Sequence, residues 1–267
     1  MNLRRAWAIA LRQMYLYQGS VARLVPLVVW VAIDMILWGF ITRYLNSVSG
    51  AKMNFVPTLL GAVLLWDFFI RVMQGVTMAF FEDVWSRNFL NIFATPLRTS
   101  EFLMGLTITS VATSAVGLVV MLILSTAFFG LSFLSYGLPL IPFLLVLYLF
   151  GIALGIFGCA LVFRLGPASE WFVWPIPALI SPFAGVFYPV ATLPVWMQWV
   201  SRALAPSYVF EGVRTIVAGG EPSMTVLAGG VALAAVTLAL SYWFFASTYR
   251  RAVRTGLIAR YSAESIS

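Results

Sequence analysis

Three charged residues inside apolar runs are the first candidates for chemistry in this sequence. Asp34 lies in VAIDMILW, and Asp67 and Arg71 lie one helical turn apart in LLWDFFIRV. A charge within such a run indicates either a pathway for protons or substrate, or an ion pair that fixes helix packing. The spacing favours packing for Asp67 and Arg71, because they can neutralise each other on one helix face. Asp34 has no local partner, so both roles stay open for it.

The residue types that most often support catalysis or metal binding are scarce. The sequence has no His, and its one cysteine, Cys159, can form neither an intrachain disulfide nor a thiolate cluster. We expect Cys159 to be a small buried residue. The one lysine, Lys52, lies in SGAKMN, which does not fit the G-x-x-x-x-G-K-[ST] pattern of a nucleotide-binding P-loop. We therefore expect a protein that is not an enzyme and that needs no cofactor or metal.

The composition is that of a membrane protein. Hydrophobic residues make up 62% of the 267 residues and charged residues 9%, whereas soluble domains have about 45–50% apolar and about 25% charged residues. The net charge of +7 comes almost entirely from arginines near the two ends and in short polar loops. That distribution favours a role in membrane topology, so we expect no nucleic-acid partner.

Six apolar segments approach the length of about 20 residues that a membrane-spanning helix needs. They cover residues 24–44, 56–79, 101–129, 138–163, 171–191 and 225–248. The sequence therefore predicts an all-α polytopic membrane protein in which residues 1–267 form a single transmembrane domain.

The distribution of positive charge predicts the orientation of these spans. With both termini in the cytoplasm, eleven of the 16 Lys and Arg residues fall on the inner side and four on the outer side. Positive charge gathers on the cytoplasmic side of membrane proteins. We expect a multi-pass protein of the cell inner (plasma) membrane with a cytoplasmic tail at residues 249–267.

Two segments outside the spans have helical periodicity. Within residues 1–20, Trp7 lies on an apolar face and Arg5 and Arg12 on the opposite face, which predicts a helix lying against membrane lipid at the interface. Residues 80–96 continue the second span as a helix with a polar row at Asp83, Arg87 and Asn91, and Pro96 ends it. The residues alone leave two interpretations of this helix equally open: a contact surface for a cytoplasmic partner, or a solvated loop.

Residues 192–220 are apolar enough to enter the membrane but are divided by prolines. Proline interrupts helices, and the pieces between these prolines are too short to cross a bilayer. We expect two short amphipathic helices, Pro194–Leu204 and Ser207–Ala218, that re-enter the membrane from the outer side. Glu211 and Arg214 should pair at i, i+3 spacing.

Taken together, these features resemble the membrane-spanning permease subunits of type-2 ABC exporters. The most specific part is FAGVFYPVATLPVWMQWVSRALAPSYVFEGVR, which covers Phe183–Arg214. A Tyr-Pro pair is followed there by Leu-Pro, Pro-Ser-Tyr and Glu-Gly-x-Arg, as in the family's region between its last two spans. The N-terminal helix, the six spans and the segment Glu82–Pro96 add to the resemblance, which extends over most of the chain.

The resemblance implies partners and residue roles. It implies a homodimer of permeases that works with two copies of a separate ATPase subunit and exports a large or amphipathic substrate. The segment Glu82–Pro96 would be the coupling helix seated in the ATPase, with contacts from Glu82, Asp83, Trp85 and Arg87. The short helices would close the pathway as an outer gate, with the participating residues Tyr188, Pro189, Pro194, Pro206, Tyr208, Glu211 and Arg214.

Two other functions are considered. An ion-coupled secondary transporter would use Asp34, Asp67 and Arg71 as a relay, and inverted repeats would be expected, but none is visible. A polytopic membrane transferase acting on a lipid-linked substrate would need a base or a metal site, for which no constellation is evident. An ATPase gene next to the permease gene would favour the exporter.

Overall fold

The computed structural model describes residues 2–48 and 56–256, and these residues form helices joined by turns and short loops. Lys52 and the end of the expected tail lie outside the described residues. The longer helices are α1 (Leu3–Gln18), α2 (Val21–Val48), α3 (Gly61–Trp85), α5 (Thr99–Phe129), α6 (Leu140–Leu165) and α10 (Met224–Arg254). The shorter helices are α4 (Phe89–Phe93), α7 (Ile176–Ile180), α8 (Val195–Arg202) and α9 (Ala205–Val217).

Five helices are long and apolar enough to cross a membrane among the described residues. They are α2, α3 with the π-helical turn before it, α5, α6 and α10. The shortest, α6, has 26 residues, which corresponds to about 39 Å at 1.5 Å per residue and exceeds a hydrocarbon core of about 30 Å. These helices match the first, second, third, fourth and sixth expected spans.

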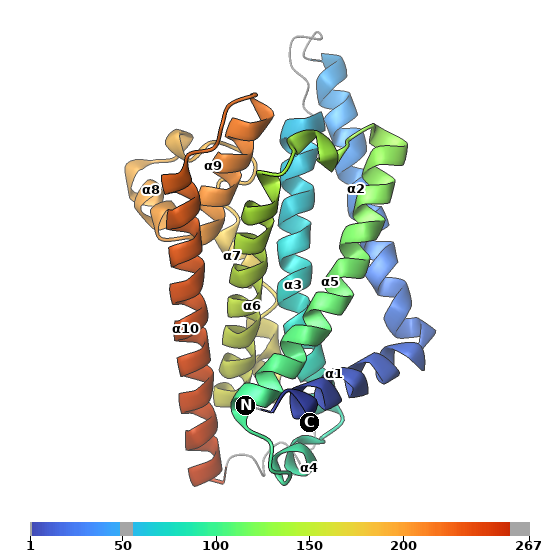
Figure 1. Ribbon diagram of the computed structural model, residues 1–267, viewed down its shortest axis with the longest axis vertical. Coiled ribbons are helices and arrows are strands. Elements are labelled where there is room, and N and C mark those ends of the chain that lie inside the picture. The colour runs from blue at the N-terminus through green and yellow to red at the C-terminus, as the bar shows by residue number, and fades with distance from the viewer. Residues whose placement is uncertain (1, 49–55, 257–267) are drawn as a thin grey trace.

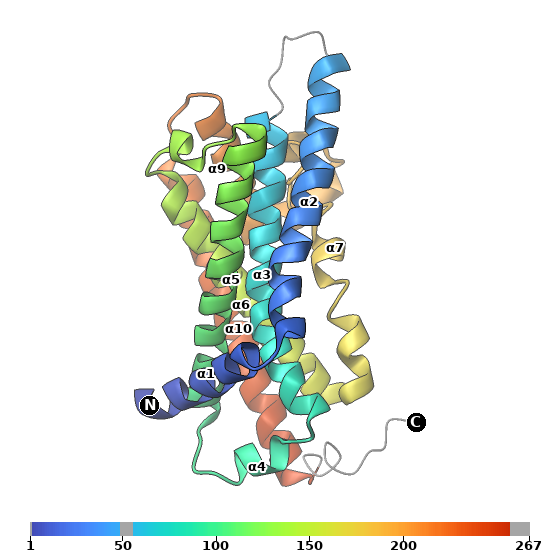
Figure 2. The same cartoon turned by 90° about the vertical axis from the view of Figure 1, so that its right-hand side faces the viewer.

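The fifth expected span, residues 171–191, is not a continuous helix. Its helical parts are the end of a 3-10 turn (Pro167–Phe172), the five residues of α7 and the start of a second 3-10 turn (Val190–Thr192). Prolines 175, 177, 182 and 189 explain the interruption, since each lacks an N–H donor and clashes with a preceding turn. The segment nevertheless runs the length of the bundle, because it joins the lower end of α6 to α8 at the opposite end (Figures 1 and 2).

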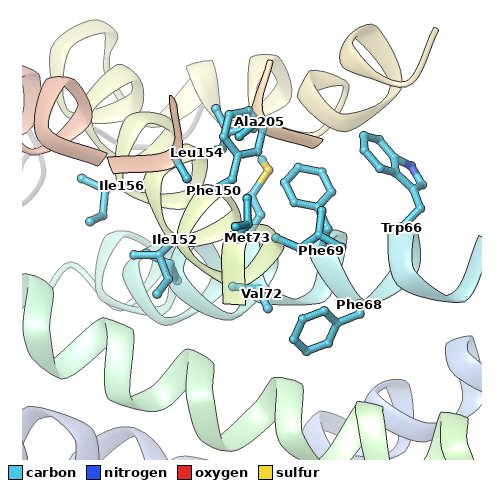
Figure 3. Close-up of a cluster of buried hydrophobic side chains, with 14 of the residues drawn as sticks. Trp66, Phe68, Phe69, Val72, Met73, Phe150, Ile152, Leu154, Ile156 and Ala205 are labelled. Atoms are coloured by element: carbon cyan, nitrogen blue, oxygen red, sulfur yellow. The ribbon is translucent and has the colours of Figure 1, made fainter. Parts of the chain in front are cut away.

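α3 is the central helix of the bundle and packs against α5 and α6. Phe69 stacks on Phe150 of α6 with ring centroids 5.7 Å apart, and the tilted ring of Trp66 lies 4.6 Å from that of Phe69 (Figure 3). A Cβ atom added at Gly155 of α6 would lie 2.7 Å from Cβ of Val76 on α3. Small residues allow this close approach where lipid gives helices little reason to associate.

α1 lies across the end of the bundle at which α3 and α6 finish (Figure 2). We call this the α1 end, and the opposite end, which carries α8 and α9, the α9 end. Ala6 and Ala10 are fully buried on the side of α1 that faces the bundle, whereas Leu3 and Trp7 are exposed. The sequence prediction of an amphipathic N-terminal helix is confirmed as far as its helical structure is concerned.

Candidate functional site

A groove runs along one face of α3 beneath α2. α2 packs mainly on α5 and contacts α3 little, which leaves a cavity of about 630 Å³ between them. Its lining on α3 recurs at helical spacing from Asp67 to Glu82, a rise of about 22 Å at 1.5 Å per residue. Tyr17 of α1, Thr113 of α5 and Trp174 complete the walls. We call this cavity the α2–α3 groove.

The end of the groove farther from α1 holds the three charges that stand out in the sequence, Asp34, Asp67 and Arg71. Arg71 donates two hydrogen bonds to Asp67, from Nε to Oδ2 at 2.7 Å and from Nη2 to Oδ1 at 3.2 Å. The expected ion pair is therefore present, and both side chains are largely buried. Asp34 of α2 lines the same part of the groove, near Asp67 and Arg71. Sequence spacing could not reveal this proximity because the residues lie on different helices.

The other end of the groove is closed by an ion pair between α2 and α3. Arg23 donates from Nε and Nη2 to the two carboxylate oxygens of Glu82, at 3.0 and 2.9 Å. Its Nη1 also donates to the Leu16 carbonyl, at 3.1 Å. Tyr17 lies beside this pair, and burial, reinforced by the negative charge of Glu82, raises the pKa of its hydroxyl above the ordinary value.

α1 is tied to α3 by a second, more deeply buried pair. Arg12 donates to Oδ1 of Asp83, whose side chain is 1% exposed. Nε of Arg12 and Oδ2 of Asp83 are buried without a hydrogen-bond partner, so the contact is a single hydrogen bond. Gln13 adds a bond from Nε2 to the Ala79 carbonyl at 2.9 Å.

The start of α1 is held by α5. The backbone N–H of Asn2 donates to Oε1 of Glu101 at 2.7 Å, and Arg5 pairs with the same carboxylate at 3.6 Å. Arg5 also donates to the carbonyl of Pro96, at the end of the loop before α5. α1 is thus fastened at both ends to the helices around it.

These contacts differ from the sequence prediction for residues 80–96. Glu82 and Asp83 bind arginines of the same chain and do not present free carboxylates to a partner. The helix is also not continuous, because α3 ends at Trp85 and Arg87 adopts a left-handed backbone with φ 54°. The expected row of Asp83, Arg87 and Asn91 on one helix face is therefore broken.

Residues 85–96, which we call the α4 segment, project past α1 at this end of the bundle (Figures 1 and 2). Phe89 and Ile92 are buried, and the ring of Phe89 lies 5.1 Å from that of Phe80. Trp85 is 44% exposed and donates from Nε1 to Glu170 at 2.9 Å, while Arg87 is exposed. The segment therefore has one face anchored to the core and one face open.

At the α9 end, α8 and α9 form close to the predicted bounds. Glu211 and Arg214 pair at 3.0 Å, as expected. Arg214 also donates from Nη2 to the carbonyls of Tyr188, at 2.8 Å, and of Gly185, while Glu211 accepts from the Val190 N–H at 2.7 Å. The pair therefore clamps the turn at residues 185–190. Burial lowers the pKa of Arg214, and the charge of Glu211 counteracts this effect.

The remaining residues of the expected outer gate support the same region. Pro194 precedes the first turn of α8 and Pro206 lies in the first turn of α9, where a missing N–H costs no hydrogen bond. The hydroxyl of Tyr188 donates to the Pro182 carbonyl at 2.8 Å, and that of Tyr208 to the Arg202 carbonyl at 3.0 Å. Pro189 directly precedes a 3-10 turn, residues 190–192.

The family to which the chain belongs follows from a comparison with known families. The family described as ABC-2 type transporter matches residues 4–218, from the first turn of α1 to the end of α9. The chain belongs to the ABC-2 type transporter family. This ABC-2 protein is therefore a permease, the membrane component of an ABC transporter, and is not itself the catalytic subunit. No curated protein matches the sequence.

Sequence reasoning missed the arginines that hold the α1 end of this ABC-2 permease together. Helical periodicity places Arg12 on a face of α1 opposite to its apolar residues, and Arg23 enters only the count of positive charges on the inner side. One signal was available: the acidic residues Glu82, Asp83 and Glu101 equal Arg5, Arg12 and Arg23 in number, and both groups fall on the predicted inner side of the membrane.

Proposed function

We propose that this chain is the permease subunit of an ATP-driven ABC exporter, that it acts as a homodimer, and that it exports a large or amphipathic substrate with two copies of a separate ATPase. Membership in the ABC-2 family over residues 4–218 is the observation that carries the proposal. The excess of Lys and Arg near the α1 end supports a cytoplasmic location of both termini and insertion in the cell inner membrane.

The α4 segment is the proposed seat of the ATPase. It lies at the α1 end, which faces the cytoplasm in the proposed orientation, and its open face carries Trp85 and Arg87. Exposed aromatic and arginine side chains are enriched in protein interfaces. Phe89 and Ile92 fix the segment to the core, so a push on the open face would displace the helices behind it.

Glu82 and Asp83 would act in coupling without touching the ATPase. They lie at the end of α3, directly before the α4 segment, and bind Arg23 of α2 and Arg12 of α1. Motion of the segment would therefore reach α2, which covers the α2–α3 groove. Glu82 and Asp83 would therefore transmit motion between helices, whereas the family resemblance implies that they contact the ATPase directly.

α8 and α9 are the proposed outer gate. In the proposed orientation they lie at the outer face, where Trp196 and Trp199 are exposed and suited to a membrane interface. The clamp of Glu211 and Arg214 holds the turn at residues 185–190 against α9. In a homodimer, two such turns near the axis would close the exit, and the short helices would dip into the membrane from outside.

One observation favours a second candidate, an ion-coupled secondary transporter. Asp34 and Asp67, from different helices, meet in the groove beside Arg71, and intramembrane carboxylates of this kind can relay protons. The two candidates differ in their energy source and in their need for an ATPase.

Assembly with the ATPase encoded beside the permease tests the proposal. The two proteins are co-expressed, purified through a tag on the permease, and weighed intact by native mass spectrometry. We expect two permeases with two ATPases. Trp85→Ala combined with Arg87→Glu should release the ATPase, whereas Arg254→Glu, a charge reversal at the same end but outside the α4 segment, should not. A permease that never associates with an ATPase would contradict the proposal.

A further inference from the structure

We propose that the α2–α3 groove is a binding site for an amphipathic organic cation and that Asp34 is its counter-ion. The inference deepens the proposed function, on which it rests for the role of the site in export. Binding itself is a property of the permease alone and can be measured without any ATPase.

The charges that line the groove do not balance. Its ionisable acidic and basic side chains are Asp34, Asp67 and Glu82 against Arg23 and Arg71. Arg23 is committed to Glu82 and Arg71 to Asp67, each through two hydrogen bonds. The carboxylate left over is that of Asp34, which lines the groove near both Asp67 and Arg71 of α3. When Asp34 and Asp67 are both ionised, the groove carries one negative charge in excess, and this charge attracts a cation at a depth where bulk water screens poorly.

The walls suit the apolar body of such a cation. Tyr17, Trp30 and Trp174 line the groove, and aromatic faces attract organic cations as well as apolar groups. Leu27, Ile70 and Met78 are further lining residues. The volume of about 630 Å³ falls within the roughly 300–1,000 Å³ that is typical of small-molecule sites.

The same contacts argue against an anionic ligand. An anion would need a guanidinium group whose charge is not already neutralised, but both arginines are paired with carboxylates.

Two probes of the same shape and opposite charge test the inference. Tetraphenylphosphonium and tetraphenylborate are titrated separately into the permease, held in nanodiscs of zwitterionic phosphatidylcholine, with empty nanodiscs subtracted. Binding is followed by isothermal titration calorimetry. The variants are Asp34→Asn, which removes the charge at constant shape, and Asp34→Glu, which keeps it. Glu221→Gln removes an exposed carboxylate outside the groove and serves as the matched control.

We expect the native protein to bind tetraphenylphosphonium and Asp34→Asn to weaken that binding by about tenfold, the effect of losing roughly 1.4 kcal/mol of charge attraction. Asp34→Glu and Glu221→Gln should retain native affinity for the cation. Tetraphenylborate should bind Asp34→Asn at least as well as the native protein. Trp30→Leu, which leaves every charge in place, should also weaken cation binding and provides a second variant if Asp34→Asn fails to fold.

Equal loss of both probes in Asp34→Asn, or cation binding that neither Asp34→Asn nor Trp30→Leu changes, would overturn the inference. Either result would leave the exporter proposal intact, because assembly with the ATPase is measured separately. Conversely, cation binding by a permease that never assembles with an ATPase would support the site and contradict the exporter.

Discussion

Substitutions of the two partners in the buried pair of Arg12 and Asp83 should lower the free energy of unfolding by unequal amounts. Arg12→Gln leaves Asp83, which is 1% exposed, as an uncompensated charge, whereas Asp83→Asn leaves Arg12, which is 31% exposed, with access to water. Breaking a fully buried pair by removing one partner costs about 3–5 kcal/mol. The contact is a single hydrogen bond with unpaired atoms on both sides. We therefore expect the lower limit of that range, about 3 kcal/mol, for Arg12→Gln.

Asp83→Asn should cost less, about 1 kcal/mol, because it loses one charged hydrogen bond but strands no buried charge. The double variant should be more stable than Arg12→Gln alone, since it removes the carboxylate that the single substitution leaves unpaired. The coupling between the two sites is then about 1–2 kcal/mol and of the sign that rescues the single variant.

The assay is the unfolding equilibrium of the purified permease in mixed micelles, followed by far-ultraviolet circular dichroism. Arg4→Gln is the control, because Arg4 is an exposed arginine on the same helix for which the structure records no ion pair. Equal costs for Arg12→Gln and Asp83→Asn, or additive costs in the double variant, would refute the reasoning that α1 is held by a buried pair.

Three further outcomes are expected. Gly155→Ala should destabilise the fold by about 1–3 kcal/mol, because the new Cβ would lie 2.7 Å from Cβ of Val76. Gly19→Ala, whose Cβ would lie at van der Waals distance, 3.4 Å, from the Tyr15 carbonyl oxygen, should be nearly neutral in the same unfolding assay. Arg214→Lys should leave the turn at residues 185–190 more open to limited proteolysis, since a lysine cannot reach several carbonyls and Glu211 together; an unchanged cleavage pattern would contradict this. Asp67→Asn should lower stability and leave ATP as the energy source of transport. Substrate movement in proteoliposomes that follows a pH gradient and is lost in this variant would favour the secondary transporter.

The sequence predicts the long helices well because each arises from an uninterrupted apolar run. α8 and α9 are also predictable, since Pro194 and Pro206 mark their starts and leave too little length for a crossing. The prediction of a continuous helix over residues 171–191 is wrong because prolines interrupt this apolar run. The mean hydropathy of the run resembles that of a span, but hydropathy does not register that Pro175 and Pro177 interrupt the helix.

The ion pairs at the α1 end could not be predicted from local spacing. Asp83 lies four residues before Arg87, the favoured order for a helical pair, yet the helix ends at Trp85 and Asp83 bonds to Arg12, 71 positions away. The neighbours of Asp34 in the groove, Asp67 and Arg71, are hidden in the same way, because they lie on α3. Packing between helices, which sequence periodicity does not encode, decides these contacts.

Control of ATP hydrolysis by the permease is the most direct test of the account. The ATPase encoded beside this permease is assayed in proteoliposomes with the native permease, with the variant carrying Trp85→Ala and Arg87→Glu, and without any permease. The account predicts that the native permease changes the hydrolysis rate and that the variant, although inserted and folded, does not. A rate that is the same in all three preparations would contradict it.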